Sequence, residues 1–273
     1  MENCSAQTIV ITGSSRGFGK SLALELQIAG ARVVISSREA DAVKRAVGEL
    51  PRPADALGVA CDVRDFDQMR ALADAALQKF GGIDVWINNA GVAHRYEKML
   101  AVDHAAWRAS FETNFFGAYH GCRVALDAIL PRQRGQIINI LGAGAFKAAP
   151  NQSAYGASKS ALARLTETLA QEYADNGIAI CAIQPGIIWT EMILDAQGVD
   201  DPKLRARFDW AKRVFGNPPE IPAWFIVELI ARGSRNGKMY RVVTPRMFVP
   251  RMIGELFGAG KRHPQPWTQR PAS

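Results

Sequence analysis

The sequence predicts a single α/β domain in which helices cover both faces of a doubly wound, parallel sheet of seven strands. Short runs rich in Val and Ile alternate along the chain with segments of helical spacing. Several of these runs are apolar almost without interruption, as expected for parallel strands that are buried on both faces. No internal repeat or low-complexity linker divides the chain, so one domain accounts for residues 1–273.

The predicted strands and helices follow one another in a regular order. The strands are the apolar, β-rich runs at residues 8–12, 32–36, 57–61, 83–88, 135–141, 178–184 and 238–243. The helices have apolar residues at helical spacing and lie at 19–30, 39–50, 65–80, 103–130, 155–176 and 222–233. Strands joined through helices in this way pair in parallel by right-handed crossovers. Two segments stand outside the alternation, a helical insertion at 189–220 and a basic tail with several prolines at 245–273.

The composition is that of a globular protein. Hydrophobic residues make up 48% of the chain and charged residues 22%. No run of about 18 apolar residues predicts a spanning helix, and residues 1–7 lack the apolar core of a signal peptide. The cysteines are scattered without a Cys-x-x-Cys pair, at Cys4, Cys61, Cys122 and Cys181. We therefore expect a cytoplasmic protein with reduced thiols, no disulfide framework and no metal site.

The net charge of +7 is concentrated at the C-terminal end. Residues 235–273 contain eight Lys or Arg and one acid, Glu255, which leaves 25 residues of each sign in the rest of the chain. The cations are interleaved with apolar residues, so this tail could contact a membrane surface or pack on a partner subunit. We favour the subunit contact, with the cations in solvent, because prolines interrupt any long helix. Nucleic-acid binding is not predicted, since no recognition motif accompanies the charge.

A glycine-rich turn follows the first predicted strand and precedes the first helix. Its glycines, Gly13, Gly17 and Gly19, have the spacing Gly-x-x-x-Gly-x-Gly. Glycines at such a turn permit close approach of a ligand to the backbone, and the helix N-terminus attracts a pyrophosphate. The position between strand and helix favours a dinucleotide site over a plain turn.

Tyr155 and Lys159 lie four residues apart within a predicted helix, so their side chains leave the same face. An ammonium beside a phenol favours the phenolate, which suits the phenol to proton transfer near neutral pH. Alone, the pair is equally compatible with an exposed pair on a helix surface. Its meaning depends on the surrounding motifs.

Together, these motifs resemble the short-chain dehydrogenase/reductase family over roughly residues 7–245. Three further motifs occur in the family's order: Asn88-Asn89-Ala90-Gly91, Asn114, and Pro185-Gly186 followed by Thr190. The resemblance implies a Rossmann-type fold, a homodimer or homotetramer, and hydride transfer between a nicotinamide and the carbonyl or alcohol carbon of a small molecule. It also implies that Tyr155 is the general acid/base, that Lys159 lowers its pKa and binds the nicotinamide ribose, and that Asn114 holds a water in the proton relay.

The second strand should end beside the adenosine ribose of the cofactor. No acid lies at the end of this strand to bond a 2′-hydroxyl. Ser37 and Arg38 lie there instead, and Arg16 adds a second cation suited to a 2′-phosphate. The sequence therefore predicts NADP(H). By the resemblance, Ile187 would also flank the nicotinamide. The predicted cofactor-binding residues are Gly13, Ser15, Arg16, Gly17, Phe18, Gly19, Ser37, Arg38, Asp62, Val63, Asn89, Ala90, Gly91, Tyr155, Lys159, Pro185, Gly186, Ile188 and Thr190.

One residue departs from the family pattern. Gly142 stands where the family has a Ser whose hydroxyl bonds the substrate oxygen. Losing one comparable donor typically costs about 3–4 kcal/mol of transition-state stabilisation. Backbone N–H groups at 142–144 or the Ser153 hydroxyl could replace this donor. Alternatively, the substrate could be an aldehyde, which is easier to reduce and depends less on this hydrogen bond. The remaining alternative is a protein that binds NADPH without catalysis.

The insertion at 189–220 lies where the family carries its substrate loop, and its apolar stripe predicts a lid and a bulky apolar substrate. The predicted substrate contacts are Gly142, Ala143, Ser153 and Trp189. Segments 142–144, 186–194 and Thr244-Pro245-Arg246 further resemble the chlorophyll(ide) b reductases. That resemblance implies, as a substrate lead, the formyl group of a chlorophyll-like tetrapyrrole.

Overall fold

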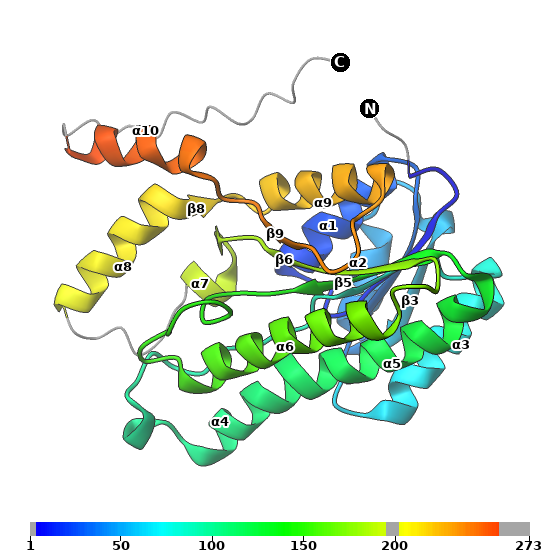
Figure 1. The fold of residues 1–273 in the computed structure, drawn as a ribbon, viewed down its shortest axis with the longest axis horizontal. Helices are drawn as coiled ribbons and strands as arrows, with labels where there is room; N and C mark the ends of the chain where they lie inside the picture. Colours follow the sequence, from blue (N-terminus) through cyan, green and yellow to red (C-terminus); the bar gives the residue numbers. More distant parts are fainter. Residues whose placement is uncertain (1–3, 195–201, 257–273) are drawn as a thin grey trace.

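The computed structural model describes residues 4–194 and 202–256, and its centre is a parallel sheet of seven strands (Figure 1). The strand order is β3-β2-β1-β4-β5-β6-β9. The strands are β1 (Thr8–Ile11), β2 (Arg32–Ser37), β3 (Ala56–Ala60), β4 (Val85–Asn88), β5 (Gly135–Ile140), β6 (Ile178–Gln184) and β9 (Met239–Arg241). All seven predicted strands are therefore confirmed, and so is the doubly wound α/β fold.

Helices cover both faces of this sheet (Figure 1). One face carries α1 (Gly17–Ile28), α2 (Ala40–Gly48) and α9 (Glu220–Arg232). The other carries α3 (Phe66–Phe80), α4 (His104–Phe111), α5 (Gly117–Ile129) and α6 (Ser153–Glu172). Successive residues of β1 serve the two layers, because Ile9 and Ile11 pack with α1 and α9 whereas Val10 packs with α3 and α5. The nearly continuous apolar strands of the sequence reflect this two-sided burial.

The predicted helix at 103–130 is interrupted by a π-helical turn. Between α4 and α5, residues Glu112–Phe116 (η3) form a π-helix. Such single turns of π-helix are frequent at functional sites. Short 3₁₀ turns occur at Pro53–Asp55 (η1), Met99–Ala101 (η2) and Leu130–Arg132 (η4). The apolar spacing of the sequence was thus sufficient to place the helix and insufficient to detect the wider turn within it.

The segment after β6 forms a small second layer beyond the sheet. Here β7 (Ile187–Ile188) pairs in parallel with β8 (Gly216–Asn217), and α7 (Glu191–Leu194) and α8 (Pro202–Phe215) lie between them in the chain. The predicted helical insertion is thereby observed over its described part, while residues 195–201 lie outside the described residues.

The start of the basic tail is a helix that packs on this layer. In α10 (Pro245–Leu256), Pro250 stands inside the helix, and the Phe248 ring contacts Phe215 of α8 at 5.1 Å. Arg251 donates from Nη1 to Gly216 O (2.9 Å) and from Nη2 to Asn217 Oδ1 (3.1 Å). The expectation that the tail cations stay in solvent is therefore wrong for Arg251. Residues 257–273, with Lys261, Arg262 and Arg270, lie outside the described residues.

The four cysteines are buried and free, which agrees with the predicted reduced thiols. Burial raises the pKa of each thiol, to about 11 for Cys4 and Cys181 and about 12 for Cys61 and Cys122. Within 4–194 and 202–256, no helix combines the length and apolar character needed to cross a membrane.

Candidate active site

The predicted site residues gather at the carboxyl edge of the sheet. The glycine turn follows β1, Ser37 ends β2, Asp62 follows β3, Asn89 follows β4, and Gly142 follows β5. Because all seven strands run in parallel, these segments share one edge, where ligands of open α/β sheets bind. The sequence order of the motifs thus becomes a spatial cluster.

The glycine turn is packed too closely for larger residues. Gly13 has φ +63°, and a Cβ there would lie 2.7 Å from Ala90 Cα. A Cβ on Gly19 would lie 2.5 Å from Asn89 Nδ2. The first turn of α1 has no side-chain cap, which leaves its N–H groups free to bind an anion. This backbone fits the pyrophosphate of a dinucleotide.

Hydrogen bonds fix the glycine turn to the turn after β4. Asn89 donates from Nδ2 to Thr12 O (2.9 Å) and Gly13 O (3.0 Å). In return, Thr12 Oγ1 accepts from the N–H groups of Asn89 (3.0 Å) and Ala90 (3.1 Å). Asn89 and Ala90 therefore hold the glycine turn of the candidate cofactor site in position.

The end of β2 offers polar groups for the ribose end of a cofactor. Ser37 Oγ is buried without a hydrogen-bond partner among the described residues, and Arg38 beside it is exposed. Arg16 reaches across to α7, where Nη1 lies 3.2 Å from Glu191 Oε2, and both side chains are largely exposed. An orphaned hydroxyl next to an exposed guanidinium suits a phosphate, which accepts hydrogen bonds from both.

The turn after β3 is held by its own ion pair. Arg64 donates to both carboxylate oxygens of Asp62, at 3.0 Å from Nε to Oδ1 and 2.5 Å from Nη2 to Oδ2. These bonds lower the pKa of Asp62. Val63 is buried against Gly117 of α5, where a Cβ would lie 2.5 Å from Val63 Cγ2. The Asp62–Val63 pair thus lies on the predicted edge, with its carboxylate engaged by a neighbour.

Asn114 is fully buried in the π-helical turn, and its amide is satisfied on every side described. Its Oδ1 accepts from Val92 N–H (2.8 Å), and its Nδ2 donates to Val92 O (2.9 Å) and Ser158 Oγ (3.2 Å). A Cβ on Gly91 would lie 3.2 Å from Asn114 Oδ1 and 3.7 Å from Lys159 Nζ. Asn114 and Lys159 therefore line the same side of Gly91, which agrees with the predicted relay.

Tyr155 and Lys159 share one face of α6, as predicted, and the ammonium lies 5.8 Å from the centre of the phenol ring. Lys159 Nζ donates to Ile140 O at 2.8 Å, and burial lowers its pKa to about 8. Burial, and then the charge of Tyr96, raise the pKa of Tyr155 to about 12. The expectation that Lys159 lowers the pKa of Tyr155 thus differs from this geometry, because the ammonium faces a carbonyl and burial dominates.

Gly142 makes room for the Tyr155 side chain. A Cβ at position 142 would overlap the Tyr155 hydroxyl and lie 2.8 Å from Cζ of its ring. Gly142 itself is buried, and its carbonyl accepts from Gln184 Nε2 at 3.3 Å. The residue that departs from the family pattern therefore directly contacts the predicted catalytic group.

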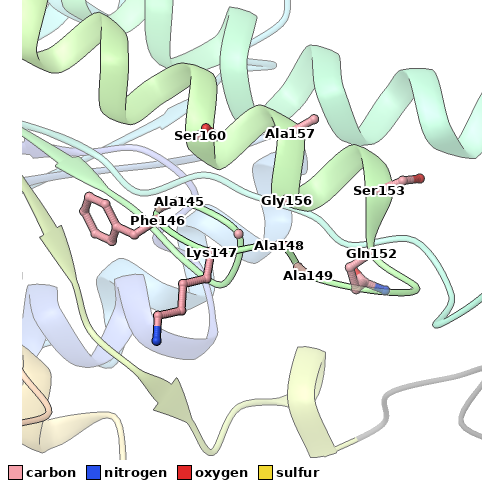
Figure 2. A pocket seen from close by; sticks show the side chains of 11 residues that line it. Ala145, Phe146, Lys147, Ala148, Ala149, Gln152, Ser153, Gly156, Ala157 and Ser160 are labelled. Carbon is pink, nitrogen blue, oxygen red and sulfur yellow. The ribbon is translucent and has the colours of Figure 1, made fainter.

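Ser153 lies on the other side of α6 from Tyr155. Figure 2 shows a pocket of about 400 Å³ between residues 144–149 and the start of α6, in which Ser153 points away from Phe146 and Lys147. The Ser153 hydroxyl accepts from Trp107 Nε1 at 3.0 Å. Because α6 begins at Ser153, two residues before Tyr155, the two side chains are about 200° apart around the helix. The Ser153 side chain therefore does not point toward Gly142. Ala143, the residue after Gly142, is exposed.

The residues after β6 place the start of the predicted lid beside the glycine turn. Gly186 has φ +88°, and a Cβ on Gly17 would lie 3.8 Å from Thr190 Cγ2, so Thr190 faces the glycine turn. Trp189 donates from Nε1 to Lys212 O of α8 at 3.3 Å. The Trp189 indole therefore packs against the end of α8, and its predicted substrate contact stays a prediction.

Sequence reasoning missed Tyr96. This residue lies in the loop after β4, and its ring meets Phe208 of α8 edge-on at 5.2 Å between centroids. The next residue, Glu97, donates from its N–H to Asn151 O at 3.1 Å, which ties this loop to the residues that precede α6. The loop has no motif or periodicity, and only the tertiary structure brings it to the site.

The chain resembles characterised oxidoreductases in sequence. A sequence model of the short chain dehydrogenases matches residues 7–197. Chlorophyll(ide) b reductase NOL of Oryza sativa subsp. japonica is 36% identical over 240 residues, which cover 85% of this chain and 68% of that protein. 3beta-hydroxysteroid dehydrogenase 1 of Eggerthella lenta is 37% identical over 213 residues, 75% of this chain and 78% of that protein.

A solved structure has the same fold. The crystal structure of 3-ketoacyl-(acyl-carrier-protein) reductase from Brucella melitensis, complexed with NADH, superimposes with a TM-score of 0.77 at 27% identity. The match covers 87% of this chain and 97% of that chain. The names of these proteins indicate chemically different substrates, so the likeness singles out no substrate for this chain.

Proposed function

The chain belongs to the short-chain dehydrogenase family of oxidoreductases, and from this premise we propose that it is an NADPH-dependent reductase of aldehydes or ketones. Its substrate is bulky and apolar, and its product is the alcohol. One observation carries the proposal: the Tyr155 hydroxyl lies over Gly142, which follows β5 at the carboxyl edge of the sheet, and the Lys159 ammonium lies 5.8 Å from the centre of the Tyr155 ring. A phenol in that place is suited to protonate a carbonyl oxygen.

The choice of NADPH over NADH depends on the end of β2. Exposed Arg38 and the unpartnered Ser37 hydroxyl support binding of a 2′-phosphate. Arg16 supplies a second guanidinium within reach of α7. The family as a whole binds a nicotinamide cofactor, and the relative with a TM-score of 0.77 is complexed with NADH. The preference for NADPH is therefore a proposal about these three side chains.

Tyr155 supplies the proton of the reaction. NADPH, when bound, supplies a hydride for the carbonyl carbon. Because the pKa of Tyr155 is raised to about 12, its hydroxyl keeps its proton at neutral pH and passes it to the oxygen as negative charge develops there. The reduced carbon and the protonated oxygen are the alcohol, and Tyr155 is left as the phenolate.

Lys159 and Asn114 return Tyr155 to its protonated form. The Lys159 ammonium lies 5.8 Å from the centre of the Tyr155 ring, and below about pH 8 it carries the proton that the relay passes on. Asn114, held by Val92 and Ser158, positions the water through which the proton arrives. As the pH rises above about 8, Lys159 loses its charge and reduction slows.

The substrate lead is a formyl group on a large planar molecule. Gly142 contributes no hydroxyl beside Tyr155 to bond the substrate oxygen, and an aldehyde is easier to reduce than a hindered ketone. The likeness to chlorophyll(ide) b reductase NOL supports a chlorophyll-like tetrapyrrole.

The test compares turnover of wild type and Tyr155→Phe with NADPH on naphthaldehyde, a cyclic ketone and chlorophyllide b. We expect wild type to reduce the aldehydes and Tyr155→Phe to lose at least a hundredfold in kcat, since general acid catalysis contributes about 10²–10⁴-fold. Tyr173→Phe, which removes a hydroxyl at the end of α6, is the control and should retain its rate. An unchanged kcat in Tyr155→Phe would refute the mechanism.

A second candidate function is a non-catalytic NADPH-binding protein, favoured by the glycine at position 142. The two differ in turnover, since both bind cofactor. If wild type binds NADPH tightly and reduces no member of an aldehyde and ketone panel, the binding protein is the correct interpretation.

A further inference from the structure

We propose that Gln184, the last residue of β6, is a positioning residue that fixes the turn at Gly142 against the Tyr155 hydroxyl. The inference rests on the proposed reductase function, because it concerns the phenol that supplies the proton. Gln184 directly precedes Pro185 and belongs to none of the motifs found in the sequence. Contacts on both sides of the turn, and the way in which the end of β6 is held, support this role.

The chain turns tightly after β5 and is pressed against α6. Gly142 O accepts from Ala145 N–H at 3.3 Å, which closes the turn. A Cβ at Gly142 would overlap the Tyr155 hydroxyl, and a Cβ at Gly144 would overlap Gly156 Cα. The turn therefore contacts α6 at two adjacent residues, and a small shift of the turn changes the space around the phenol.

The Gln184 side chain holds this turn from the side of the sheet. It is half-buried, and its Nε2 donates to Gly142 O at 3.3 Å. The same oxygen accepts from Ala145 N–H, and because a carbonyl oxygen has two lone pairs, the two donors satisfy it. Without the amide, Gly142 O would keep only the bond within its own turn. The turn would then lose its side-chain link to β6.

The place of Gln184 in the sheet brings its side chain to the turn. Strand β6 lies between β5 and β9 (Figure 1). Ala182 packs with Ala163 of α6, and residues two apart on a strand share a face, so Gln184 also lies on the α6 side. Leu141 N–H donates to Ile183 O at 2.8 Å, which joins the ends of β5 and β6. The sheet therefore places the amide next to the turn.

The backbone of Gln184 is held on its other side. Its carbonyl oxygen accepts from Val242 N–H at 3.1 Å, and the residue is in register with Arg241 of β9. Two residues later, Gly186 has φ +88°, and a Cβ there would overlap Val243 Cγ2. Because the end of β6 is paired and the chain after it is closely packed, the amide has a fixed origin. It therefore fixes the turn, and with it the space of the phenol, relative to the sheet.

The first test is the kinetics of Gln184→Met, which keeps the length of the side chain and removes the donor. With naphthaldehyde and NADPH, we expect kcat to fall about tenfold and KM to stay within about twofold, because a displacement of about 1 Å can cost up to hundredfold in rate. Gln136→Met is the matched control, since Gln136 is also half-buried on a strand and its Nε2 donates to Ile230 O at 3.2 Å. It should lower the Tm comparably and leave kcat unchanged. An unchanged kcat in Gln184→Met, or an equal loss in Gln136→Met, would overturn the proposal.

The second test asks whether Gln184 acts through Gly142. Residues in direct contact show non-additive effects, and the amide contacts the Gly142 carbonyl. Gly142→Ala displaces the phenol by itself, so adding Gln184→Met to it should lower kcat by a smaller factor than in wild type. Losses that multiply in the double variant would contradict a role through Gly142.

A spectroscopic measurement separates this inference from the proposed function. The chain has five tyrosines, and labelling each with ¹³C at Cζ gives resonances among which Tyr155→Phe identifies that of Tyr155. We expect Gln184→Met to shift the Tyr155 resonance and Gln136→Met to leave it in place. This measurement needs no turnover, so it tests the position of the phenol even if the chain reduces no aldehyde. An unmoved Tyr155 resonance in Gln184→Met would overturn the role of Gln184 even if the chain is an active reductase.

Discussion

The Tyr155 hydroxyl occupies the space that a side chain at position 142 would fill. A Cβ at position 142 would overlap the Tyr155 hydroxyl, so the glycine and the present position of the phenol depend on each other. The φ angle of Gly142 is not positive, so its backbone conformation does not require glycine. The need for glycine at this position is explained by the space that the Tyr155 hydroxyl occupies.

Adding one methyl group at this position should displace Tyr155. We expect Gly142→Ala to lower kcat by at least tenfold, because a displacement of about 1 Å can cost up to hundredfold in rate. The Tm should change little, since the overlap is with the end of a side chain, which can rotate. Gly48→Ala, where a Cβ meets nothing within 4 Å, is the control for the substitution itself. A wild-type kcat in Gly142→Ala would show that Tyr155 does not need this space.

Lys159 is a candidate catalytic residue whose burial reduces stability. Its side chain is 3% exposed, and its pKa is lowered from 10.5 to about 8, which corresponds to about 3 kcal/mol at neutral pH. The unfolded chain binds the proton more tightly than the folded chain between these two values. Stability from this residue is therefore lowest below pH 8 and recovers as the pH rises toward 10.5.

Replacing the ammonium should remove this cost. We expect Lys159→Met to raise the free energy of unfolding by about 1–3 kcal/mol at pH 7, less than the full cost because the bond to Ile140 O is lost. The gain over wild type should shrink as the pH rises from 8 to 9.5, in urea unfolding measured at each pH. A gain that is absent at pH 7, or that grows with pH, would contradict a depressed pKa for Lys159.

At the scale of the elements, the sequence predicts what depends on local pattern. The strands and the glycine turn are confirmed because two-sided burial leaves continuous apolar runs and because Gly13 must adopt φ +63°. The π turn at Glu112–Phe116 escapes prediction, since one wider turn barely alters the apolar spacing. The position of Tyr96 and the overlap at Gly142 could not be predicted for another reason. They depend on contacts between distant parts of the chain, which the sequence spacing of residues does not reveal.

Arg251 of α10 binds β8 at the end of the segment that the sequence predicts to be a lid. Arg251 is partly buried and donates to Gly216 O and Asn217 Oδ1, and burial lowers its pKa. Asn217 is itself fully buried in β8, which pairs with β7 next to the candidate nicotinamide contacts. The basic tail therefore supports β8 at this residue.

Removing this guanidinium should loosen β8 without unfolding the domain. In Arg251→Ala the two acceptors lose their donor, which costs about 1–3 kcal/mol locally. We expect faster amide hydrogen exchange in β8 and a severalfold higher KM for the aldehyde, with kcat near wild type. Lys238→Ala removes an exposed cation close in sequence and should change neither quantity. Unaltered exchange in β8 would show that α10 does not support the lid.

At the scale of the whole molecule, the candidate cofactor site collects segments from most of the chain. The turns after β1, β2, β3 and β4 come from residues 12–91, whereas Tyr155, Lys159 and Thr190 come from residues 155–190. A dinucleotide along the carboxyl edge would touch both sets at once. Binding to the folded state alone then stabilises the entire domain by mass action.

Thermal unfolding with and without cofactor should therefore report the whole site. At a concentration one hundred times Kd, a ligand adds about 2.7 kcal/mol, which in a domain of this size raises the Tm by about 5–10 °C. We expect NADPH to reach this shift at lower concentration than NADH, because Arg38 and Ser37 favour the 2′-phosphate. In Arg38→Ala the two cofactors should give nearly equal shifts, while Arg45→Ala, which removes an exposed cation on α2, should keep the wild-type difference. Equal Tm shifts in wild type would mean that the site does not distinguish NADPH from NADH. The absence of a Tm shift with either cofactor would contradict a dinucleotide site at the carboxyl edge.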